Sequence, residues 1–102
     1  MSEPGESSEV ADEPDLWVAV LHISDRTAEK IHSKHWITPD EVRQAVVCVT
    51  GLDYGWDDDP ERGMRALVDC RIRGARVIVV LYPATEPPDD VYHLGSAYPR
   101  NT

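Results

Sequence analysis

The most informative segment of this sequence is Ile31-His32-Ser33-Lys34-His35-Trp36-Ile37-Thr38-Pro39-Asp40-Glu41-Val42. It carries the signals that end one helix, followed at once by the signals that start another. Thr38 can cap the free amides of a new helix, and Glu41 can reach back to complete a capping box. Pro39 suits the first helical position, where its missing N–H group is not needed. We therefore predict two helices joined by a tight turn.

The residues on either side extend this pattern. Residues 16–23 favour β structure and predict a largely buried first strand. Ser24 and Asp25 then offer an N-cap for a first helix of about ten residues, which ends in the basic group at 32–35. The second helix should carry an apolar stripe as far as Val49 and stop at Thr50-Gly51.

The second half of the chain predicts a hairpin-rich sheet. Residues 51–63 hold four glycine or proline positions and predict a loop or a short edge strand. Strands are expected at 64–72, 75–82 and 91–98, with Arg73-Gly74 as a hairpin turn and 83–90 as a proline-rich turn. The order β-α-α-β-β-β predicts an α+β fold, a small antiparallel sheet with two helices packed on one face.

The charge of the chain is concentrated at its N-terminus. The net charge is -9, but residues 1–15 hold six acids and no base, so residues 16–102 carry 13 acids against 10 bases. Residues 1–15 predict a disordered acidic tail, and residues 16–102 a single domain. No apolar run is long enough to span a membrane and no signal peptide is recognisable, so we expect a cytoplasmic protein with no membrane partner.

Two groups of side chains suggest chemistry. Lys34 and His35, with His32, can move protons and stabilise a phosphate, or they can simply complement the dipole of the first helix. Five of the ten basic residues fall within 62–76, and alternation places several of them on one sheet face. That face suits phosphates or an acidic partner, or it is balanced by neighbouring carboxylates at 57–59, 61 and 69. These arginines are Arg62, Arg65, Arg71, Arg73 and Arg76.

No metal or cofactor site is predicted. The acidic run 57–59 lacks the glycine-punctuated spacing of a calcium loop, and no Cys or His pair has zinc spacing. There is also no phosphate-binding glycine loop and no nucleophile elbow.

With these elements in place, the chain resembles the BrnT-like toxins of the RelE/ParE superfamily. Residues 34–42 are similar to that family's K-H-G-[IV]-[ST]-x-E-E-[VA] block, and further similarity runs from 22 to 99 in the same order. The segments that carry it are 23–31, 34–42, 65–67, 74–80 and 95–98. Two positions differ: Trp36 stands in place of the usual glycine, and Tyr98 in place of a final arginine.

The resemblance implies the toxin of a type II toxin–antitoxin module, bound by an antitoxin protein and acting on RNA or the ribosome. Several relatives cleave RNA without a metal, which needs a base, cations on the phosphate and an acid. By resemblance the candidate catalytic residues are His35, Arg65 and Tyr98. The candidate substrate-binding residues are Lys34, Arg71, Arg73 and Arg76. The alternative is a catalytically inactive RelE-like fold that acts as a protein-binding module.

Overall fold

Local capping sets the two helices of the computed structural model, which describes residues 16–85 and 89–100. Helix α2 spans Asp25–His35, and the hydroxyl of its N-cap Ser24 accepts a hydrogen bond from the amide of Thr27 at 3.1 Å. Helix α3 spans Pro39–Val46. The amide of Glu41 donates to Thr38 Oγ1 at 3.2 Å, and the amide of Thr38 donates to Glu41 Oε1 at 2.9 Å. The predicted capping box is confirmed.

The expected length of the second helix is wrong. Helix α3 ends at Val46, because the next residues pair with the segment before the first strand. Val47 forms a parallel bridge with Val18, and the Cys48 amide donates to the Val18 carbonyl at 2.8 Å. Val49 therefore lies outside the helix.

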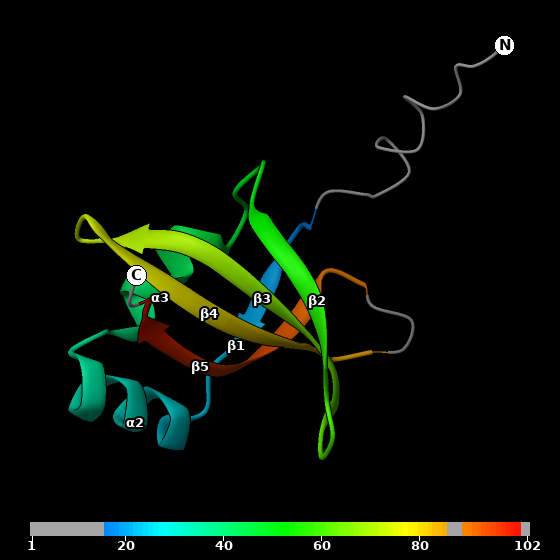
Figure 1. The fold of residues 1–102 in the computed structure, drawn as a ribbon, viewed down its shortest axis with the longest axis horizontal. Coiled ribbons are helices and arrows are strands. Elements are labelled where there is room, and N and C mark those ends of the chain that lie inside the picture. Colours follow the sequence, from blue (N-terminus) through cyan, green and yellow to red (C-terminus); the bar gives the residue numbers. More distant parts are fainter. Residues whose placement is uncertain (1–15, 86–88, 101–102) are drawn as a thin grey trace, which may run out of the picture.

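A five-stranded mixed sheet lies beside these helices (Figure 1). Its order is β1-β5-β4-β3-β2, and all neighbours are antiparallel except β1 and β5. The bounds are β1 Val20–His22, β2 Asp53–Asp59, β3 Gly63–Ile72, β4 Ala75–Pro83 and β5 Val91–Pro99. The α+β class and the number of helices are confirmed.

The prediction of a purely antiparallel sheet is wrong. Strand β1 runs parallel to β5 over three residue pairs, from Val20 opposite Val91 to His22 opposite His93. Parallel neighbours need a long connection, and here both helices and three strands lie between them. The predicted strand at 16–23 is correspondingly short. Leu16 and Val18 precede it and enter the core instead.

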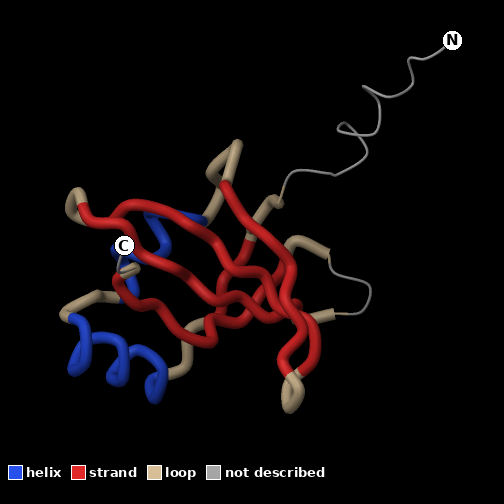
Figure 2. The backbone as a smooth tube through the Cα atoms, viewed as in Figure 1, coloured by secondary structure: helices blue, strands red, loops and turns tan. Residues whose placement is uncertain are grey.

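Of the two possibilities left open for residues 51–63, the edge strand is observed. Strand β2 pairs with β3 from Asp53 opposite Asp69 to Asp59 opposite Gly63. Figure 2 shows the β2–β3 hairpin projecting away from the end of the sheet where the helices lie. The tail predicted at 1–15 lies outside the described residues.

Alternation divides the sheet into two faces. Ile31 of α2 with Val42 and Val46 of α3 are buried in the same core as one set of strand side chains. That set includes Ala66, Val68, Val77, Val79, Leu81 and Leu94. The other set lies on what we call the open face. Its side chains include Asp57, Asp59, Arg65, Leu67, Asp69, Arg71, Arg76, Ile78, Val80, Tyr82, His93, Ser96 and Tyr98.

Candidate functional site

Arg65 is the centre of a first polar cluster on the open face. Its Nε donates to Asp57 Oδ2 at 2.8 Å, and its Nη1 lies 3.6 Å from Asp59 Oδ2. The hydroxyl of Tyr82 donates to the same oxygen of Asp59 at 2.8 Å. The guanidinium carbon of Arg62 stands 4.0 Å from the centre of the Tyr82 ring, in cation–π geometry. A substrate phosphate would have to displace these carboxylates from Arg65.

A glycine makes room for Tyr82 in this cluster. A Cβ atom built on Gly95 would lie 2.3 Å from Tyr82 Cε2 and 2.9 Å from Cδ2. Gly95 sits where the β4–β5 register shifts, next to the irregularity at Val80 and Leu81. The ring is therefore buried on the open face, although no helix covers it there among the described residues.

A second polar cluster surrounds Asp69. Arg76 Nη2 donates to Asp69 Oδ2 at 2.6 Å, and Arg100 Nη1 donates to the same oxygen. The hydrogen bond from Arg76, reinforced by Arg100, holds the pKa of Asp69 below its usual value. In the first cluster the pKa of Asp59 is lowered by the amide of Glu61 and then by Tyr82. Both aspartates are thus ionised partners of nearby arginines.

The arginine-rich face was interpreted either as a binding face for phosphates or an acidic partner, or as a face neutralised by neighbouring carboxylates. The structure favours the second interpretation. Arg65 and Arg76 pair with carboxylates of neighbouring strands, and hydrogen bonds that Arg65 donates to Tyr82 and Asp57 raise the pKa of Arg65. Asp57, Asp59 and Asp69 provide this balance, while no ion pair of Asp58 or Glu61 is found among the described residues.

Arg73 and Arg71 lie at the other end of the sheet, in and beside the β3–β4 turn. The turn residues Arg73 and Gly74 both have positive φ, 53° and 80°, as the predicted tight hairpin requires. Arg73 Nε pairs with Glu41 Oε2 at 2.8 Å, and its Nη2 donates to the carbonyl oxygen of Trp36. Arg71 Nη1 donates only to the carbonyl of Gly74, at 3.2 Å, among the described contacts.

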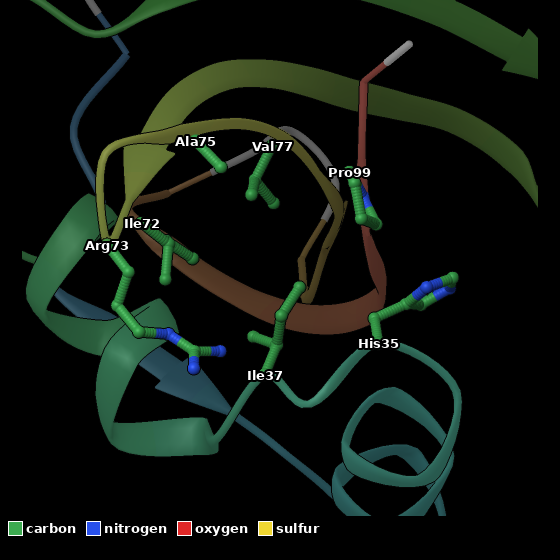
Figure 3. Close-up of a pocket in the computed structure, with 7 residues that line it drawn as sticks. All are labelled: His35, Ile37, Ile72, Arg73, Ala75, Val77 and Pro99. Carbon is green, nitrogen blue, oxygen red and sulfur yellow. The ribbon is translucent and has the colours of Figure 1, made fainter.

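A cleft of about 140 Å³ lies between this turn and the end of α2 (Figure 3). Figure 3 shows aliphatic side chains of Ile37, Ile72 and Val77 at its centre, with His35 and Arg73 on opposite sides. Ala75 and Pro99 complete the lining. Lys34 precedes His35 in the last turn of α2 and is exposed. The cleft is therefore apolar inside and basic at its rim.

The three candidate catalytic residues do not come together. Arg65 is level with Tyr82 in the β3–β4 register, whereas Tyr98 is level with Ile78 and Asp69. Four residues of a strand separate these two levels, about 13 Å. His35 lies at the end of α2, on the side of the sheet that carries the helices. Of the predicted site residues in the described part of the chain, His35 and Arg73 line this cleft, and Arg71 and Arg73 line a neighbouring one.

No metal or membrane site is found in the described part of the chain. Residues 16–85 and 89–100 contain no group of three or more His, Cys, Asp or Glu side chains placed to hold a metal. Cys48 is exposed and Cys70 half-buried, and burial raises the pKa of the Cys70 thiol to about 11. No described helix has the length and hydropathy needed to cross a membrane.

Comparisons with protein-family models, with curated proteins and with solved structures find no match for this chain.

Two features of the site escape prediction from sequence. Tyr82 lies in a nearly all-apolar run of sequence, and its contacts with Asp59 and Gly95 depend on the pairing of distant strands. Trp36 adopts φ 61° and ψ 28°, the left-handed conformation of a helix C-cap, and is 72% exposed. A helix stop at this position was detectable, but the exposure of the indole was not.

Proposed function

We propose that the protein is the toxin-like member of a type II toxin–antitoxin pair and that it works by binding a protein partner, the antitoxin. The observation that carries this proposal is the pairing of Arg65 and Arg76 with carboxylates of their own sheet. A surface of alternating, already neutralised charges suits the mixed charges of a protein better than a run of phosphates. The resemblance of residues 34–42 to BrnT-like toxins supplies the class of partner.

The number of exposed large apolar side chains supports a binding role. Trp36, Trp56, Met64 and Tyr98 are each at least 38% exposed in this small domain. Tryptophan and tyrosine are enriched where protein interfaces concentrate their binding energy. The four do not form one patch, because the strand registers place Trp56 and Met64 on the opposite sheet face from Tyr98, and Trp36 lies at the end of α2. Each is a separate candidate anchor for a partner.

Co-purification tests the proposal. The chain is expressed alone and together with the product of a short neighbouring reading frame, and growth and complex formation are followed. We expect a stable complex and, if the chain alone inhibits growth, relief of that inhibition. Failure of the two proteins to associate at micromolar concentration would reject the proposal.

A metal-independent ribonuclease is the second candidate, favoured by one observation. His35 and Arg73 lie on the rim of the same cleft, so a proton-transfer group and a cation share one site. If expression degrades RNA and His35→Ala abolishes the degradation, the ribonuclease assignment replaces the binding one. If the triple variant at His35, Arg65 and Tyr98 still inhibits growth, those residues do not carry the toxicity.

A further inference from the structure

Trp36 occupies a backbone conformation that favours glycine, without gaining burial in return. The left-handed region is unfavourable for a residue with a Cβ atom, and helix C-caps in this conformation usually carry glycine. Trp36 is 72% exposed, and within the described part of the chain its ring contacts one other ring, that of His32, at 5.8 Å between ring centres. Folding alone gives no reason for a tryptophan here, so a role in binding is the physical alternative.

Basic side chains lie next to Trp36 on the α2 side. The last turn of α2 contributes His32, Lys34 and His35 and contains no acid. Glu41 is paired with Arg73, and hydrogen bonding to Thr38, with help from Arg73, keeps its pKa low. Asp40, in the first turn of α3, is the remaining exposed acid nearby in the chain. A ligand reaching Trp36 therefore meets the ammonium group of Lys34 and two imidazole rings on the α2 side.

Two clefts adjoin this turn and share Ile72 and Arg73. The first is the cleft beside His35, and the second, of about 290 Å³, is lined by Glu41, Gln44, Ala45 and Arg71 in addition to the shared pair. Trp36 lies in the chain between His35 and Ile37, which both line the first cleft, and its carbonyl is held by Arg73. We call Trp36 and the two clefts together the tryptophan groove.

We propose that the tryptophan groove binds an extended acidic segment of a partner protein, with one aliphatic side chain in the first cleft and carboxylates facing Lys34 and Arg71. The first cleft has the volume of about four or five waters, which suits one branched aliphatic group. Its aliphatic floor offers nothing to a phosphate, and this favours a peptide over a nucleic acid. The inference rests on the proposed protein-binding function and adds the place and the chemistry of the contact.

Titration of the full-length protein with short synthetic peptides tests the inference. The probe contains Asp-Glu-Leu-Asp-Glu, and the controls replace its leucine by serine or its acids by lysine. Amide NMR signals report where each peptide binds. We expect the acidic leucine peptide to shift signals of residues 34–37 and 71–77 with a Kd below about 1 mM. The two controls should bind at least several-fold more weakly.

Variants separate the groove from the rest of the surface. Trp36→Gly should weaken binding of the peptide about tenfold. The melting temperature of this variant should equal or exceed that of the wild-type protein. Lys34→Glu, a change on an exposed side chain, should weaken binding without unfolding. Trp56→Ala is the matched control, because Trp56 is another exposed tryptophan, on β2, away from the groove. Equal binding by wild type, Trp36→Gly and Lys34→Glu would overturn the inference.

Other occupants of the groove are outcomes that also overturn it. An oligouridine shifting the same signals more strongly than the peptide would assign the groove to nucleic acid. Shifts caused by neutralising the acids of residues 1–15 within the full chain would assign it to the chain's own tail. Concentration-dependent shifts without peptide would assign it to a second copy.

An antitoxin that binds Trp36→Gly as well as wild type would reject this inference alone. Peptide binding without any antitoxin complex would reject only the proposed function.

Discussion

The guanidinium of Arg73, in the turn between β3 and β4, donates a hydrogen bond to the carbonyl oxygen of Trp36, 37 residues earlier in the chain. The same side chain pairs with Glu41, the residue that closes the capping box of α3. One arginine thus joins the end of α2, the start of α3 and a hairpin of the sheet. The turn that presents Trp36 is held in place by the sheet as well as by its own caps.

Replacing Arg73 tests this connection. In Arg73→Ala the hydrogen bond to Trp36 is lost, which alone should lower the free energy of unfolding by about 1 kcal/mol. Urea denaturation measures the change. Arg71→Ala is the control, because within residues 16–85 and 89–100 Arg71 donates only to the nearby Gly74 carbonyl, and it should change the urea midpoint little. Equal effects of the two variants would mean that Arg73 does not connect the helices to the sheet.

At position 36, glycine should stabilise the folded protein more than alanine does, the reverse of their usual order in helices. Because φ is 61°, Trp36→Gly should be more stable than Trp36→Ala by about 1 kcal/mol. Thermal and urea unfolding compare the two variants. At Ala28, inside α2, alanine should be the more stabilising residue. Ala28→Gly should lower the free energy of unfolding by about 1 kcal/mol. If alanine is preferred at both positions, residue 36 is not left-handed in solution.

Gly95→Ala should destabilise the protein by about 2 kcal/mol, because the new methyl group collides with the buried ring of Tyr82. The unfolding free energy measures this cost. Gly55→Ala, in β2, is the matched control: its Cβ would meet nothing within 4 Å, and its φ is not positive. A neutral Gly95→Ala would show that Tyr82 does not pack against this glycine.

Stability should fall in acid, with a contribution from Asp59 and Asp69. Their folded pKa values lie below 3.8, so the unfolded chain takes up protons first as the pH drops. Their stabilising contribution is complete well above pH 3.8 and is lost as the pH falls through the folded values. The loss of stability is measured from the urea midpoint of unfolding at a series of pH values between about 6 and about 3. Asp69→Asn should flatten the profile, whereas Asp58→Asn, the control, should leave its shape unchanged.

Much of this molecule follows from short stretches of its sequence. The capping box of α3 needs only residues 38–41, and the hairpin turn needs only Arg73 and Gly74, because their hydrogen bonds and φ angles are local. Alternation from 64 to 72 was also enough to assign Ala66 and Val68 to the core and Arg65 to the other face. These elements were predictable because their causes lie within a few residues.

Relationships between distant segments were not predictable. Only the register of β2, β3 and β4 determines that Arg65 meets Asp57 and that Arg76 meets Asp69. Likewise the termination of α3 at Val46 depends on pairing with Val18, and the parallel pairing of β1 with β5 depends on the path of the whole chain. The separation of His35, Arg65 and Tyr98 has the same origin. The starts of both helices, the β3–β4 turn and the facing of β3 followed from the sequence alone, because each depends on neighbouring residues. Only the tertiary structure decided which charges are neutralised and that Trp36 is exposed, because both depend on contacts between residues far apart in the chain.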